Sequence, residues 1–272
     1  GLPYVMQQIL RPIAGRPGLF TTAGLCSYLE KEVLQGVKAF EEFIPDIFIV
    51  ATQLDNSRKV VFGRYNFPGP VHDPTARYYT GTSVIDAAAA SMSVPPFYAP
   101  HPIKNPQTGQ IDYYIDGEIR ETLSTHVAID NDCEYIISSW THTPYHYQDE
   151  IGSLIHYGLP AVCVQAIYLM IQKKIVAMRG QRMMARDIIN TVNEYCKNNR
   201  IEGHHRRNIL SILETKLNYK KNVKLIDIYP RHEDYDLFFS GFFSLRPEVS
   251  SRAVKMGHRR TLEVFRKRAW ED

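Results

Sequence analysis

The sequence predicts an α/β fold, in which a mostly parallel sheet is covered by helices on both faces, because strand-like and helix-like segments alternate along the chain. Some of the strand-like segments are continuously apolar, which is typical of strands buried on both faces. A long stretch of helical pattern in the middle of the chain predicts a helical insertion or cap over residues 150–220.

The length and composition are those of a globular chain. The 272 residues are 44% hydrophobic and 22% charged, and the 16 Gly and 16 Pro show no period. These values exclude collagen-like, low-complexity and disordered classes. We therefore expect one domain over residues 1–272, with the segment 150–220 inserted into it.

In the first part of the chain, apolar residues at helical spacing predict a helix over 19–44, which Thr21 or Thr22 can cap. The next segments predict a strand pair at 46–52 and 58–62, followed by a loop at 64–77. A compact alanine-rich helix is then predicted at 83–92, and Pro95 and Pro96 end it.

In the remainder, we predict strands at 111–115, 133–139 and 223–229, and the second of them reads as buried on both faces. The helical patterns between and after these strands cover 122–130, 152–197, 206–217 and 247–270.

The charge is distributed unevenly. Residues 1–171 carry 10 basic and 17 acidic side chains, a balance of −7, whereas residues 172–272 carry 22 and 12, a balance of +10. Such a basic part either faces an anionic partner or is a set of solvated helix faces. The basic residues beside the apolar run 159–171, which we expect to meet an anionic lipid surface, are Lys173, Lys174, Arg179, Arg182 and Arg186.

The four cysteines contain no C-x-x-C pair, so we expect reduced, mostly buried thiols. The run 159–171 is 13 residues long, shorter than the roughly 20 that a spanning helix needs, so we predict no membrane span. No secretory signal is apparent at the N-terminus. The expected location is the cytoplasm or the membrane surface that borders it.

A carboxylate residue stands at the turn after one predicted strand: the strand at 111–115 ends in Asp116-Gly117-Glu118. Ligands of open α/β sheets gather at the ends of strands, and a Gly after the Asp allows a sharp turn there. A D-G pair alone is most often only a turn. Its surroundings therefore decide its meaning.

Those surroundings resemble the patatin-like phospholipase family. The segments that carry the resemblance are 46–62 (DIFIVATQLDNSRKVVF), 84–100 (VIDAAAASMSVPPFYAP) and 114–117 (YIDG). In that family a strand of the "vvvaTdl" type precedes a helix of the "aaaASaaiPgfFpP" type, which leads to a strand that ends in D-G-G or D-G-A.

The resemblance implies a three-layer α/β fold and a serine acyl hydrolase with a Ser–Asp dyad. In such an enzyme a serine in a G-x-S-x-G turn attacks a lipid ester, and the Asp of the D-G motif, here Asp116, accepts its proton. Glu118 replaces the usual small residue; its carboxylate either raises the pKa of Asp116 or points away. The sequence contains neither a G-x-S-x-G turn nor a Gly-rich oxyanion loop. We therefore expect both to lie upstream of Gly1 or on another chain, or to have been lost, and we expect this chain alone to be inactive.

Three serines near the motif read as structural. Gly81-Thr82-Ser83 begins like a nucleophile turn, but Ile85 occupies the position of the second Gly. Ser83 followed by Asp86 is a helix N-cap with an acidic third residue. Ser91 and Ser93 read as helix-end and turn residues.

Histidines offer a different chemistry. His142, His146 and His156 follow the strand at 133–139 and are a candidate metal site, although their spacing fits no ligand frame and the alternative is surface histidines. His204 and His205 read as a polar helix start that can also contact phosphate.

The sequence therefore predicts a patatin-like lipid acyl hydrolase of the phospholipase A or lysophospholipase type, with Asp116 as its one assigned site residue. The alternative is a non-catalytic patatin-like module that binds lipid or a protein. Expected partners are a phospholipid or other lipid ester, a peripheral membrane surface and a chain that carries the N-terminal part. We expect no nucleic acid, because no such motif accompanies the basic residues, and no cofactor or metal, because a dyad needs none.

Overall fold

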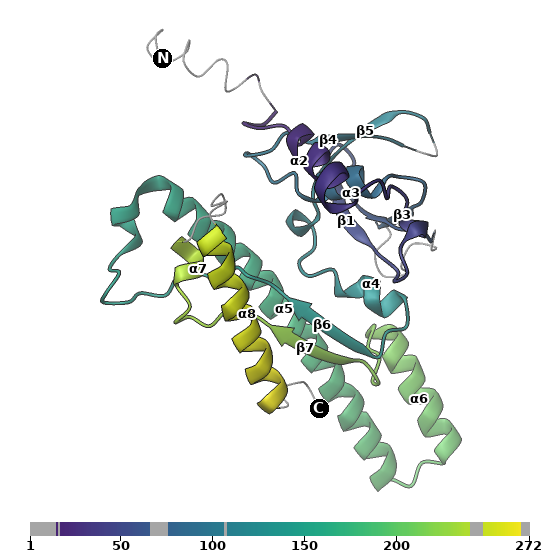
Figure 1. Cartoon of the computed structure of the whole chain (residues 1–272). Helices are drawn as coiled ribbons and strands as arrows, with labels where there is room; N and C mark the ends of the chain where they lie inside the picture. The colour runs from purple at the N-terminus through teal and green to yellow at the C-terminus, as the bar shows by residue number, and fades with distance from the viewer. Residues whose placement is uncertain (1–14, 16, 66–75, 106–107, 240–246, 268–272) are drawn as a thin grey trace, which may run out of the picture. The chain divides into compact units, whose positions relative to one another are not determined.

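The computed structural model describes residues 15, 17–65, 76–105, 108–239 and 247–267 (Figure 1). By its internal contacts the chain divides into two compact units, Gly1–Ser124 and Thr125–Asp272. Each unit contains its own β-sheet. The expectation of a single domain over the whole chain stays a prediction.

The first unit contains a mixed five-stranded sheet in the order β3-β2-β1-β5-β4. Helices flank this sheet, so the α/β class is confirmed. Its strands are β1 (Ile49–Gln53), β2 (Arg58–Phe62), β3 (Arg77–Tyr79), β4 (His101–Lys104) and β5 (Ile111–Asp116).

The expectation of a mostly parallel sheet is wrong for this unit. β1 is antiparallel to both β2 and β5, β4 is antiparallel to β5, and β2 with β3 is the one parallel pair in the sheet. The connections explain this. Residues 54–57 between β1 and β2 form a short turn, and a turn of that length can join only antiparallel strands.

The core of the first unit lies between the sheet and α3 (Val84–Ser91), which contacts β1, β4 and β5. Three of the four consecutive alanines, Ala87, Ala89 and Ala90, are fully buried in this contact. Their small side chains allow the helix to approach the sheet closely. Phe40, Val60, Phe62 and Tyr114 are the large side chains that complete the core.

The helix predicted over 19–44 is shorter than expected. It comprises α2 (Ala23–Tyr28) and a π-helical turn, η1 (Leu29–Val33). It ends because Gln35 and Gly36 adopt positive φ angles of 46° and 97°. Phe40 then enters the core from a 3₁₀ turn, η2 (Phe40–Glu42). The strands β3 and β4 were not predicted, and most of the predicted loop at 64–77 lies outside the described residues.

The second unit contains a parallel pair of strands, β6 (Tyr135–Ser139) and β7 (Lys224–Ile228), and helices α4 (Thr125–Asp130), α5 (Gly158–Asn198), α6 (Gly203–Lys216), α7 (Asp236–Phe239) and α8 (Pro247–Lys267). The helical segments predicted at 122–130, 152–197, 206–217 and 247–270 correspond to α4, α5, α6 and α8, with the last residues of the final range outside the description. A 3₁₀ turn, η4 (Leu154–Tyr157), precedes α5. The helices α5 and α6 occupy the range expected for a helical insertion.

The prediction that the strand at 133–139 is buried on both faces is wrong. Burial alternates along β6: Ile136 and Ser138 are buried, while Tyr135 and Ile137 are 63% and 56% exposed. Ile136 packs with Val223 and Leu225 and with α4, and this is the covered side. A continuously apolar strand can therefore be covered on one face only.

The helix α5 is 41 residues long and is the longest helix in Figure 1. By length and composition, the helical stretch Leu154–Asn198 is apolar enough to cross a membrane: its most apolar 18-residue window has a mean hydropathy of 1.7, and 6% of that window is buried. The sequence analysis considered only the 13-residue apolar run 159–171 and did not predict a helix of this length and hydropathy. Most of this apolar surface lies outside the core of the unit.

Candidate active site

Asp116 is the last residue of β5 and pairs with Ala51 of β1 across the sheet. Its backbone N–H donates to the carbonyl oxygen of Ser93, just after α3, at 3.0 Å. Its Oδ1 accepts a hydrogen bond from the backbone N–H of Glu118 at 2.6 Å. The carboxylate is therefore fixed relative to the strand, the helix end and the turn that follows it, η3 (Gly117–Ile119).

Gly117 is required here by close approach. A Cβ atom at this position would lie 2.5 Å from the carbonyl oxygen of Val50 and 2.8 Å from its carbonyl carbon. Gly117 is not among the described glycines with positive φ. The D-G pair thus serves to bring β1 against the turn that holds Asp116, not to supply a left-handed backbone conformation.

The environment of Asp116 favours proton acceptance. Burial raises the pKa of the Asp116 carboxyl group above its ordinary value, and the hydrogen bond from the Glu118 N–H partly opposes this. The Glu118 carboxylate is not among the causes, and its Oε2 accepts from the Leu123 N–H at 3.4 Å. Of the two alternatives for Glu118, the structure supports the one in which it points away. A carboxylate with a raised pKa is a stronger base than a solvated one.

A family model described as Patatin-like phospholipase matches residues 5–129. This segment of the chain is therefore similar to the patatin-like phospholipase family. No curated protein matches the sequence.

The matched segment includes every strand of the five-stranded sheet, α3 and Asp116. The resemblance in the sequence is thereby confirmed. At the level of the family, the patatin-like segment indicates a hydrolase of lipid esters, with lipids as its substrates.

In the part of the chain that the structure describes, the hydroxyls of Ser83 and Ser93 make hydrogen bonds to residues of α3. Ser83 is the N-cap of α3: its Oγ accepts from the Asp86 N–H at 3.0 Å and donates to Asp86 Oδ2 at 2.6 Å. Ser93 is fully buried, and its Oγ donates to the carbonyl oxygen of Ala89 at 2.8 Å. The prediction that both are structural is confirmed.

A chain of polar side chains that the sequence did not predict, buried at Thr22 and His101 and half-exposed at Asp86, links three elements of the patatin-like segment. Thr22 Oγ1 lies 2.7 Å from His101 Nδ1, and His101 Nε2 lies 3.1 Å from Asp86 Oδ1. The hydrogen bond to His101 lowers the pKa of Asp86, with burial opposing it. Thr22 was expected to cap a helix, but its hydroxyl makes no cap hydrogen bond and turns to His101 instead.

The order hydroxyl, imidazole, carboxylate is that of an activated nucleophile. However, Thr22 and His101 are only 5% and 8% exposed. A nucleophile must reach a substrate carbonyl, so this chain of hydrogen bonds joins α2, β4 and α3 as a structural clamp. No signal in the sequence connects Thr22 with His101, which lies 79 positions away, or His101 with Asp86, which lies 15 positions away.

The three histidines considered as a metal site are not brought together. His142 is largely buried beside Tyr168, with ring centroids 5.6 Å apart, and burial lowers its pKa. The ring of His146 lies beside that of His232, with ring centroids 3.7 Å apart, and His156 lies in η4. Among the described residues, the one group that gathers three metal-ligand atoms within 4.8 Å is Glu202, His204 and His205.

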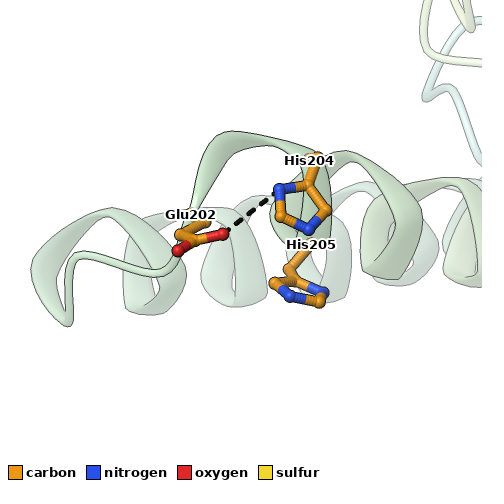
Figure 2. A group of neighbouring side chains, drawn as sticks. All are labelled: Glu202, His204 and His205. Atoms are coloured by element: carbon orange, nitrogen blue, oxygen red, sulfur yellow. Dashed lines mark ion pairs between the residues drawn. The ribbon is translucent and has the colours of Figure 1, made fainter.

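That group is shown in Figure 2. All three side chains are exposed at the start of α6, and His204 Nδ1 pairs with a Glu202 carboxylate oxygen at 3.3 Å. The rings of His204 and His205 lie 3.9 Å apart. The arrangement is a solvent-exposed ion pair with a neighbouring imidazole, and we assign it no role in the chemistry.

Two of the basic residues that follow the apolar run of α5 bond to other parts of the second unit. Arg179 pairs with Asp227 and lies over the rings of Trp140 and Tyr229 at 5.2 and 5.3 Å. Arg182 donates to the carbonyl oxygen of Val223. Arg179 therefore fixes α5 to β7 and Arg182 fixes it to the residue before β7, which removes both from the set expected to meet lipid.

Proposed function

We propose that the chain contributes the proton acceptor of a lipid acyl hydrolase of the phospholipase A or lysophospholipase type, with Asp116 as one half of a Ser–Asp dyad. The observation that carries this proposal is the Asp116 carboxylate: it is partly buried, has a raised pKa and is held at one oxygen by the Glu118 N–H.

The reaction would proceed through an acyl-enzyme. The serine Oγ attacks the ester carbonyl as its proton moves to the Asp116 carboxylate, and the leaving alcohol takes that proton when the ester bond breaks. Water then attacks the acyl-enzyme, again giving a proton to Asp116, which returns it to the serine. The Glu118 N–H keeps the carboxylate oriented through both steps.

The serine in this proposal comes from a segment that is not within these 272 residues. The sequence contains no G-x-S-x-G turn. In the described part of the chain, Ser83 and Ser93 are committed to hydrogen bonds within α3. This chain alone is then expected to be inactive, and the serine would be supplied upstream in the same polypeptide or by another chain.

The proposal is tested by Asp116→Asn in a protein that includes the serine-bearing segment. Turnover of a phospholipid and of a soluble ester should fall by at least about 100-fold, the range for loss of a general base. Asp112→Asn on the same strand is the matched control, because Asp112 bonds to Asn105 at 2.7 Å and not to the turn, and it should retain turnover. Equal turnover in Asp116→Asn and the parent would refute the dyad.

A second measurement tests the source of the serine. A fluorophosphonate probe should not label the isolated 272-residue chain, and peptide mapping of the complete protein should place the label outside these residues. Labelling of a serine within this chain would overturn that part of the proposal. If the complete protein is neither labelled nor active, the non-catalytic lipid- or protein-binding module becomes the better interpretation.

A further inference from the structure

The outer side of α5 is an apolar face that no described element of the second unit covers. Its inner side packs on the second unit through Tyr168, Ile175, Ala185, Ile189 and Cys196. On the other side, large apolar side chains are 47% to 75% exposed. We call the following residues the outer face of α5: Leu159, Val162, Leu169, Met170, Val176, Met183 and Met184.

The outer face continues over several helical turns. From Leu159 to Met184 is 26 residues, which at 1.5 Å per residue is about 39 Å of helix. Exposed apolar patches of this extent on a soluble protein mark a contact with another molecule or with a membrane. Single exposed apolar residues, by contrast, need no explanation.

The charged residues within the segment that carries the outer face are of one sign. The segment 151–186 contains no Asp or Glu and five Lys or Arg residues. Of these, Arg179 and Arg182 bond to β7 and its preceding residue, and Arg186 pairs with Asp187. Lys173 and Lys174 are exposed in the middle of the apolar stretch. The face ends where the first carboxylate, Asp187, appears. Lysines among exposed apolar side chains are the pattern of a helix that lies on an anionic bilayer, because the long stem stays in the apolar layer while the ammonium reaches the phosphates.

The packing of α5 favours a helix that lies in the surface over one that spans the bilayer. The side chain of Gln165 bonds to both the backbone N–H and the carbonyl of Tyr145, at 2.8 and 3.0 Å. Tyr168 is buried against Tyr145 and Phe238. Spanning would strip these contacts from the apolar half of the helix, whereas docking leaves them in place and covers only the outer face.

We infer that the outer face of α5, with Lys173 and Lys174, is a docking surface for an anionic phospholipid bilayer. The inference rests on the proposed function only in its choice of lipid as the occupant, which the family's lipid substrates favour. A second copy of the chain and an unrelated protein are the other occupants, and both are outcomes of the test below.

Binding is measured by sedimentation of the full 272-residue chain with vesicles of phosphatidylcholine alone or mixed equally with phosphatidylglycerol. We expect binding to the mixed vesicles that weakens in high salt. Leu169→Glu and Met170→Glu should each weaken binding about tenfold or more. The matched controls are Ile212→Glu in α6 and Val254→Glu in α8, which are 61% and 71% exposed in the same unit and should bind as the parent does.

The two exposed cysteines report which surface is covered. Cys163 lies on α5 beside Val162, and Cys133 lies just before β6. An environment-sensitive dye on Cys163, in a Cys133→Ser background, should shift to the blue on vesicles. The same dye on Cys133, in a Cys163→Ser background, should not.

Several results would overturn the inference: no binding to anionic vesicles, equal loss in the α5 variants and the controls, or a shift of the Cys133 dye alone. A dimer in sedimentation equilibrium that Leu169→Glu dissociates would assign the face to a second copy. Resistance to alkaline extraction would indicate a spanning helix. Asp116→Asn should bind vesicles as the parent does, so failure of docking and failure of the dyad are separate results.

Discussion

The substitution Gly117→Ala tests how the structure holds Asp116. The new Cβ would lie 2.5 Å from the carbonyl oxygen of Val50, so β1 and η3 must separate by roughly 0.9 Å before the contact reaches an ordinary 3.4 Å. Both groups are backbone and cannot swing aside. Overpacking of this kind costs about 1–3 kcal/mol. We therefore expect urea unfolding to show a loss of this size in the first unit.

The same substitution should also reduce ester hydrolysis in a protein that carries the serine. Separation at Gly117 moves the neighbouring carboxylate relative to β1, and misplacement of a catalytic group by a fraction of an ångström slows the reaction. Gly24→Ala in α2 is the control, because nothing lies within 4 Å of a Cβ there and Ala is favoured in a helix by about 0.5–1 kcal/mol. If Gly117→Ala were as stable and as active as Gly24→Ala, the close approach would not be what this glycine provides.

Three other predictions follow from the side-chain contacts. Ser83→Ala removes the N-cap of α3 and should lower stability by about 1 kcal/mol in urea, while hydrolysis persists in the complete protein; loss of hydrolysis would contradict the cap assignment. Asp116→Asn should be more stable than the parent at pH 7 and equal to it below about pH 4, because a carboxyl group with a raised folded-state pKa loses stability as the pH rises through that pKa; a less stable Asn variant at pH 7 would contradict this sign. Arg179→Lys loses the planar group above Trp140 and Tyr229 and should cost about 1–2 kcal/mol in urea, whereas Arg207→Lys on an exposed helix face should change little; equal effects would contradict it.

Local patterns in the sequence predicted the elements that local interactions decide. The β1–β2 pair follows from two apolar β-branched runs around a turn, and α3 follows from an N-cap and an alanine run before two prolines. Asp116 at a strand end was also predictable, because the strand, the D-G pair and their order along the chain are visible without a structure. These features depend on neighbours in sequence.

Long-range contacts were not predictable in the same way. The Thr22–His101 hydrogen bond joins residues 79 positions apart, and the role of Gly117 depends on where the Val50 carbonyl lies. The prediction of the direction of strand pairing was also wrong, because an apolar run does not indicate whether its partner strand is parallel or antiparallel. Likewise, an apolar strand such as β6 can have one face open, as Tyr135 and Ile137 show.

The two functional assignments depend on different parts of the chain. The proposed dyad residue, Asp116, lies in the first unit, inside the family match, whereas the proposed docking face lies on α5 in the second unit, beyond residue 129. Chemistry on a soluble ester needs only the first, since a small ester reaches a carboxylate without a bilayer. Hydrolysis at a membrane needs both, because a lipid held in a bilayer is presented only to a protein that stays at its surface. Under this assignment, Lys173 and Lys174, the first basic residues of the positively charged part 172–272, favour an anionic surface as the partner of the docking face.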